Sequence, residues 1–186
     1  GFTLGTTLLS LLMELFVYEF AARESQTDCS LELVYEDRLK SRNTVQLPGG
    51  ETLHYILKSG TSLKDGDKLL AHDAHKAKKI IAIIAAPEKL IEARALKDLD
   101  FIRAVYHLGN RHVQTEIKHD ENGWILLLQP DPVLEGMLRH LQCQVKEVFA
   151  PFQPEGGAYE GEHRHHHGHS HAHDTGSDAK IHSFSS

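Results

Sequence analysis

Residues 98–149 read DLDFIRAVYHLGNRHVQTEIKHDENGWILLLQPDPVLEGMLRHLQCQVKEVF, and their apolar positions change between helical and strand spacing. A first amphipathic helix is predicted over residues 97–107, where the expected buried stripe is Leu99, Ile102, Val105 and Tyr106. Gly109 and Asn110 are expected to end this helix, because glycine adopts the left-handed cap conformation without steric cost.

Two strands and a second helix follow in the same stretch. Period-two alternation predicts strands over residues 113–117 and 124–128, joined by a turn at 120–123. Asp131 is a good N-cap for the second helix, and Pro132 suits its first position. The buried stripe of that helix is expected to contain Val133, Leu134, Met137, Leu138 and Leu141.

Strands on both sides of this stretch complete a domain. Residues 89–95 and 143–149 each have strand chemistry, so the order over residues 88–157 is β-α-β-β-α-β. This is the order of the ferredoxin-like fold. Because that fold hosts many unrelated functions, the order by itself does not indicate a chemistry.

The preceding residues, 28–87, indicate an all-β domain of about six strands. Leu31, Leu33 and Tyr35 form one side of an alternating pattern, and KKIIAIIA at 78–85 is typical of a buried strand. The fold class is therefore α+β, with an all-β N-terminal domain followed by a ferredoxin-like domain. Three histidines of the first domain lack mutual ligand spacing and are interpreted as surface or strand-edge residues: His54, His72 and His75.

Residues 1–27 are an uncertain N-terminal segment. The uncharged stretch at 1–13 is shorter than the roughly 20 apolar residues that a membrane span needs, and the basic region of a signal peptide is missing. The favoured interpretation is a helix through Leu8, Leu12 and Leu15, and a secretory or anchoring role carries less weight. No function is assigned to this segment.

The composition excludes several classes of function. The 186 residues include 20 Lys and Arg and 26 Asp and Glu, which gives a net charge of −6. This acidic balance makes a nucleic-acid partner unexpected. Two distant cysteines, Cys29 and Cys143, suggest neither a disulfide framework nor a cysteine zinc site, and they fit a reducing, cytoplasmic compartment without a membrane anchor. The sequence also lacks a phosphate loop, an HExxH motif and a nucleophile–base constellation, so no enzymatic activity is expected.

Histidine is unusually frequent in this composition, and the histidine-rich run near the C-terminus is interpreted as a metal-binding tail. Residues 158–186 contain few large apolar side chains and are expected to be disordered. Seven of the 15 histidines lie among the 11 residues from 163 to 173 of this tail: His163, His165, His166, His167, His169, His171 and His173. An affinity tag is disfavoured because the run is irregular and 13 more residues follow it. Neutral imidazole suits Ni, Cu, Zn and Co, and affinity alone would not choose among them.

Four segments carry a resemblance to a known family: LVYEDRLKSR at 33–42, GTSLKDGDKL at 60–69, VYHLGNRHV at 105–113 and APFQPEGGAY at 150–159. With them, residues 28–173 resemble the UreE urease accessory proteins, which are nickel metallochaperones. The resemblance implies a first domain with peptide-binding character and a metal-binding second domain that joins a homodimer. It further implies delivery of Ni2+ to the urease apoprotein together with an accessory GTPase and two other accessory proteins, with Zn2+ or Cu2+ as competing ions.

The resemblance also implies a metal ligand in the folded domain. His112 of the GNRH stretch corresponds to the family's ligand, and two copies meet near the dimer axis, where they share a metal. Some members have a His-Asp-His triplet where this chain has Pro130-Asp131-Pro132, so an extra surface site is not expected. His107, His119 and His140 are not expected to be ligands. Phe152 and Tyr159 are interpreted as packing anchors.

Two other functions compete with nickel delivery. A general nickel or zinc storage protein would use the tail as a sink and would need neither a client nor a fixed dimer site. A metallohydrolase would need several folded His, Asp and Glu ligands around one open site, and the sequence of the two domains indicates no such cluster.

Overall fold

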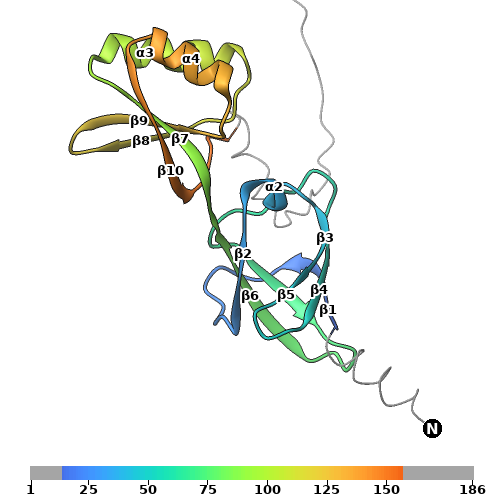
Figure 1. Cartoon of the computed structure of the whole chain (residues 1–186). Helices are drawn as coiled ribbons and strands as arrows, with labels where there is room; N and C mark the ends of the chain where they lie inside the picture. Colours follow the sequence, from blue (N-terminus) through green and yellow to red (C-terminus); the bar gives the residue numbers. More distant parts are fainter. Residues whose placement is uncertain (1–13, 157–186) are drawn as a thin grey trace, which may run out of the picture. The chain divides into compact units, whose positions relative to one another are not determined.

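This computed structural model describes residues 14–156, which form two β-sheets (Figure 1). The first sheet has the strand order β2-β6-β5-β1-β4-β3. Its pairs β1/β4 and β2/β6 are parallel, and the other neighbours are antiparallel. Its strands are β1 (Glu14–Phe20), β2 (Cys29–Leu33), β3 (Arg42–Gln46), β4 (Thr52–Ile56), β5 (Lys68–His72) and β6 (Lys78–Ala85).

The core of the first sheet follows from period-two alternation along its strands. Inward residues of neighbouring strands are fully or nearly fully buried, and they make one cluster that includes Val17, Leu53, Tyr55, Leu69 and Ile81. One helical turn, α2 (Tyr35–Arg38), follows β2. The strand expected to run through Tyr35 therefore ends two residues earlier, at Leu33.

The helix predicted through Leu15 is wrong, because Leu15 lies in strand β1. Leu15 and Val17 are buried and alternate with less buried neighbours, as a strand requires. β1 is a central strand between β4 and β5, so the sheet begins upstream of residue 28. Leu8 and Leu12 lie outside the described residues.

The second sheet has the order β10-β7-β9-β8, with all neighbours antiparallel. The observed element order is strand, helix, strand, strand, helix, strand, as the sequence predicts. The elements are β7 (Pro87–Ala95), α3 (Asp98–Asn110), β8 (Glu116–Asp120), β9 (Gly123–Leu128), α4 (Pro132–His140) and β10 (Cys143–Pro151). In the part of the chain that the structure describes, no helix is long and apolar enough to cross a membrane.

The N-terminus of α4 confirms its sequence prediction. The Asp131 carboxylate accepts hydrogen bonds from the backbone N–H groups of Val133 and Leu134, at 2.8 and 3.1 Å. Leu138 is fully buried, and Leu134, Met137 and Leu141 pack against the same core. Val133 was expected in this stripe, but its side chain is 77% exposed. It precedes Leu134 in the first turn and faces outward.

The buried face predicted for α3 is largely wrong. Leu99, Ile102 and Tyr106 are 56%, 60% and 64% exposed. Val105, the fourth residue of the predicted stripe, does pack on the core of the sheet, together with Phe101, Ala104 and Leu108. Both sets have helical spacing, and the pattern alone does not show which one the sheet covers.

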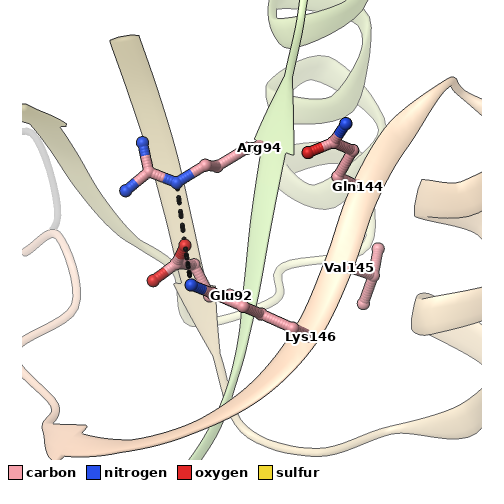
Figure 2. A pocket seen from close by; sticks show the side chains of 5 residues that line it. All are labelled: Glu92, Arg94, Gln144, Val145 and Lys146. Atoms are coloured by element: carbon pink, nitrogen blue, oxygen red, sulfur yellow. Dashed lines mark hydrogen bonds and ion pairs between the residues drawn. The ribbon is translucent and has the colours of Figure 1, made fainter. Parts of the chain in front are cut away.

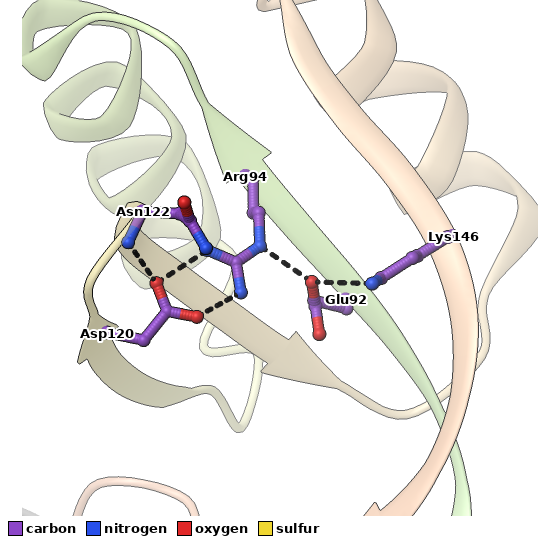
Figure 3. Close-up of polar contacts among 5 residues, drawn as sticks. All are labelled: Glu92, Arg94, Asp120, Asn122 and Lys146. Atoms are coloured by element: carbon purple, nitrogen blue, oxygen red, sulfur yellow. Dashed lines mark hydrogen bonds and ion pairs between the residues drawn. The ribbon is translucent and has the colours of Figure 1, made fainter.

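Charged side chains cross the face of the second sheet that lies opposite its helices (Figure 3). Lys146 Nζ lies 3.3 Å from Glu92 Oε1, which also accepts a hydrogen bond from Arg94 Nε at 2.8 Å. Arg94 reaches on to Asp120, and its Nη1 donates to Asp120 Oδ1 at 2.8 Å. Hydrogen bonds from Arg94 and from the backbone N–H of Asn122 lower the pKa of Asp120 to about 2.

Asp120 is predicted to stabilise the fold above pH 4 and to lose this contribution as the pH falls toward 2. Its pKa lies near 2 in the folded chain against an ordinary value of 3.8, so acid protonates the unfolded chain first. Asp120→Asn should therefore lower the free energy of unfolding at pH 7, with little difference from the parent near pH 2. Urea unfolding between pH 7 and pH 2 measures this, with Glu121→Gln in the same turn as the control. A pH-independent difference would contradict the charge-pair explanation.

Candidate functional site

His112 lies just beyond the C-terminus of α3. The helix ends at Asn110, Arg111 follows as its cap, and His112 has a positive φ of 54°. The N–H of His112 donates to the carbonyl of Gly109 at 2.9 Å, and the N–H of Val113 donates to the carbonyl of Leu108 at 3.1 Å. This pair of hydrogen bonds defines a Schellman motif, in which the residue with positive φ is usually glycine.

The helix ends at Gly109 and Asn110, as the sequence predicts. The predicted cause is wrong, because the residue in the left-handed conformation is not Gly109. Gly109 and Asn110 are the last two helical residues, and the left-handed residue is His112. The apolar pair Leu108 and Val113 explains the difference, because both side chains pack in the core of the second sheet. The Schellman motif brings these two residues together, and this fixes residue 112 at the left-handed position.

The backbone at His112 is costly for a histidine. A non-glycine residue in the left-handed region costs on the order of 1 kcal/mol, although histidine is among the side chains that adopt it more often. The side chain is exposed, and within residues 14–156 the structure records no hydrogen bond or ion pair for its imidazole. The imidazole therefore faces solvent at a fixed point of the backbone.

The other folded histidines do not gather around His112. His107 lies in α3 edge-on to Tyr106, His119 lies edge-on to Trp124, and His140 is the last residue of α4. His54 accepts or donates a 2.9 Å hydrogen bond with Thr44 and stacks on Phe16. Between residues 14 and 156 no group of three or more His, Cys, Asp or Glu side chains could hold a metal ion. The seven histidines from His163 to His173 lie outside the described residues, and so does Tyr159.

A small cavity of about 200 Å³ lies on the charged face of the second sheet (Figure 2). Its lining residues are Glu92, Arg94, Gln144, Val145 and Lys146. Figure 2 shows the Glu92 carboxylate between the Arg94 and Lys146 side chains, and both cations contact it. Because its charges are paired with one another, this cavity offers a ligand no free cationic or anionic group of matched geometry.

Two family models match the chain over most of its length. The model described as UreE urease accessory protein, N-terminal domain, matches residues 18–86, and the corresponding C-terminal domain model matches residues 88–176. The chain belongs to the UreE family. This confirms the resemblance found in the sequence, and the boundary between the two UreE matches falls at the junction of β6 and β7.

Curated proteins named urease accessory protein UreE are similar to the chain. The protein from Dechloromonas aromatica is 49% identical over 134 residues, which are 72% of this chain and 75% of the relative. The proteins from Burkholderia lata and Paraburkholderia xenovorans are 47% and 44% identical over 73% of this chain, which spans 61% and 56% of their lengths. UreE proteins are urease accessory proteins by name, so membership implies a role in urease maturation rather than catalysis by the chain itself.

His112→Gly is predicted to keep the fold of this UreE chain while it removes the imidazole. Glycine adopts positive φ freely but loses more entropy on folding, so the free energy of unfolding should stay within about 1 kcal/mol of the parent. His112→Val should lower it by about 1–3 kcal/mol, because a β-branched residue is poorly tolerated at positive φ. Urea unfolding of the three proteins measures this order. A glycine variant less stable than the valine variant would contradict the left-handed assignment.

Proposed function

We propose that this chain is a nickel metallochaperone that binds Ni2+ and delivers it to the urease apoprotein during maturation. The observation that carries the proposal is the exposed imidazole of His112, held at a backbone position that favours glycine, in a chain of the UreE family. The chain itself is not an enzyme in this proposal. It acts in the cytoplasm with the accessory GTPase and the other accessory proteins, without a nucleic acid or a membrane.

One imidazole per chain is too few for a nickel site, so the proposal includes a homodimer. A two-fold interface places the same residue twice at short distance, and two copies of His112 would then supply two ligands. The remaining positions are left to the tail histidines, from His163 to His173, or to water. Nickel, zinc and copper all accept imidazole, so Zn2+ and Cu2+ compete for such a site.

The exposed side of α3 supports this interface. Leu99, Ile102 and Tyr106 follow one another at spacings of three and four residues, which places them on one side of the helix. All three are more than half exposed, and contiguous exposed apolar surface marks interaction sites. The stripe runs along the helix that ends just before His112, so a contact between two copies of it would bring the two helix ends into one assembly.

The second domain is proposed to be ferredoxin-like and to carry the metal site. Its sheet order β10-β7-β9-β8, with both helices packed on one core, supports this classification. The boundaries proposed for the two domains, 28–87 and 88–157, are supported by the change of sheet at Ala86, although β1 adds residues 14–20 to the first domain. The tail at 158–186 is proposed to act as a metal reservoir.

A storage protein without a client is the competing proposal. It shares the tail histidines but gives His112 no role, because a sink needs only many weak sites. The two proposals therefore differ in whether loss of one folded imidazole affects metal transfer, and not in how much metal the chain holds.

Ile102→Lys is predicted to convert a dimeric parent into a monomer. The substitution places a charge at the centre of the apolar stripe, and desolvation of an unpaired charge opposes association. Sedimentation at micromolar concentration measures the change, with circular dichroism to verify the helices. Val133→Lys, on the exposed side of α4, is the matched control and should remain dimeric. A parent that is monomeric both with and without nickel would refute the shared site.

Removal of residues 158–186 is predicted to abolish most nickel binding but to leave one tight ion per dimer. His112→Gly should do the reverse: most of the metal stays bound, the tightest event disappears, and urease activation at limiting nickel falls. Calorimetric titration and an activation assay measure both effects, and His140→Ala, an exposed histidine of α4, is the control. If His112→Gly activates urease as well as the parent, the storage proposal is favoured and the transfer site is wrong.

A further inference from the structure

A single residue joins the two sheets along the chain. β6 ends at Ala85 and β7 begins at Pro87, so only Ala86 lies between them. The N–H of Ala86 donates to the carbonyl of Leu33, the last residue of β2, at 3.0 Å. So short a link anchors the two sheets at one point. Contacts elsewhere therefore determine whether the two domains open together or separately.

The helical turn α2 makes such contacts, although it belongs to the first domain. The N–H of Tyr35 donates to Glu88 Oε1 of β7 at 2.8 Å. The ring of Tyr35 meets the ring of Phe152 edge-on, with centroids 5.1 Å apart. Tyr35 packs against an apolar cluster whose buried members all belong to the second domain: Leu90, Ile125, Leu127 and Phe152. The turn therefore covers apolar surface of the other domain.

Arg38, the last residue of α2, bonds to both domains from a buried position, with only 3% of the residue exposed. Its Nε donates to the carbonyl of Leu33 in the first domain at 3.2 Å, and its Nη2 donates to the carbonyl of Phe152 in the second. Hydrogen bonds from a charged donor are stronger than neutral ones, and a carbonyl that loses its donor in a dry place is destabilising. Arg38 therefore ties the two domains together at the turn.

The same turn contacts the connection that carries His112, residues 111–115 between α3 and β8. The hydroxyl of Tyr35 donates to Gln114 Oε1 at 3.3 Å. Gln114 is two residues after His112, so a side chain of the first domain holds the connection close to the candidate ligand.

The residues on either side of Gln114 are anchored within the second domain. The N–H of Val113 donates to the carbonyl of Leu108 at 3.1 Å, and the carbonyl of Thr115 accepts a hydrogen bond from the N–H of Glu155 at 2.9 Å. Gln114 is therefore the position at which the first domain acts on a connection that is otherwise held by its own domain.

We propose that α2 is an interdomain joint that restrains the connection after His112, and that Tyr35 and Arg38 are positioning residues for the His112 backbone. Arg38 and the packed ring of Tyr35 hold the turn against the second domain, and the Tyr35 hydroxyl passes this restraint to Gln114. Without the joint, the connection opens locally while the helices stay folded. The inference rests on the proposed function only for its consequence in nickel binding.

Amide hydrogen exchange, followed by NMR in the metal-free full-length chain, measures this opening. The N–H of Val113 is the reporter, because its bond to Leu108 breaks when the helix end opens. Tyr35→Phe keeps the ring and removes only the hydroxyl, and it should raise the exchange rate of Val113 about threefold or more. The N–H of Leu141, which bonds to Met137 at the end of α4, should keep its rate because it reports on the rest of the domain.

Tyr18→Phe is the matched control, because Tyr18 is a 63% exposed tyrosine of β1 in the same domain as Tyr35. It should change neither rate. Gln114→Ala should raise the Val113 rate as Tyr35→Phe does, and the double variant should exchange no faster than the faster single variant. Effects that multiply in the double variant, or an unchanged Val113 rate in Tyr35→Phe, would overturn the proposal.

Arg38→Gln tests the buried end of the joint. It should raise the Val113 rate about tenfold or more, because it removes the charged donor shared by the two domains. Arg42→Gln, at an exposed arginine of β3, should leave the rate unchanged. If the Val113 and Leu141 rates rise by the same factor in folded Arg38→Gln, the whole domain is destabilised and the positioning role is overturned. If Arg38→Gln does not fold, the Tyr35 and Gln114 variants decide.

Calorimetric titration then connects the joint to nickel. Tyr35→Phe should weaken the tightest nickel event about twofold or more, because a looser ligand position loses more freedom on binding. Tyr18→Phe should leave that event unchanged. Equal nickel affinity in the parent and in Tyr35→Phe, despite faster exchange at Val113, would overturn the positioning role. If the parent binds no nickel, the proposed function fails while the exchange result stands.

Discussion

The hydrogen bond from the N–H of Val113 to the carbonyl of Leu108 is the constraint on which the functional part of the structure depends. It exists because Leu108 and Val113 both pack in the core of the second sheet, on either side of the helix end. It ends α3, turns the chain toward β8 and leaves residue 112 with a positive φ. The packing of Leu108 and Val113 thereby determines how the chain turns toward β8 and leaves the His112 imidazole exposed.

Part of the fold is readable from the sequence because its signals are local. The N-cap at Asp131 and the proline after it define the start of α4, and the alternating strands define the sheets. The buried side of α3 was not readable, because the helix has two apolar sides. One side, with Phe101 and Leu108, meets the sheet, while Leu99 and Ile102 remain exposed. Periodicity identifies an amphipathic helix but not the surface that will cover each side.

The remaining misses also have physical causes. The sequence pattern predicts a helix at β1 because the leucine-rich residues before this strand mask the alternation of Leu15 and Val17. The strand character of β1 comes from its pairing with β4 and β5, which lie far away in the sequence. Residues 152 and 153 show no periodicity, and their position depends on hydrogen bonds with Arg38 and Glu116, which are distant in the sequence. His112 was singled out through a family resemblance alone, since a histidine with positive φ leaves no mark in a hydrophobic pattern.

The backbone strain at His112 indicates that stability alone does not explain which residue follows the end of α3. A sequence chosen for stability alone would place glycine at residue 112, because glycine adopts positive φ without steric cost. The chain instead has an exposed imidazole there, and the N–H of Glu155 donates to the carbonyl of Thr115, three residues after His112. In the proposed metal carrier, the left-handed position at the end of α3 would hold one ligand at a fixed point of the backbone. That fixed position costs on the order of 1 kcal/mol of backbone strain. A ligand exposed at a helix end needs no deep pocket, and the small cavity on the second sheet is lined by charges that pair with one another.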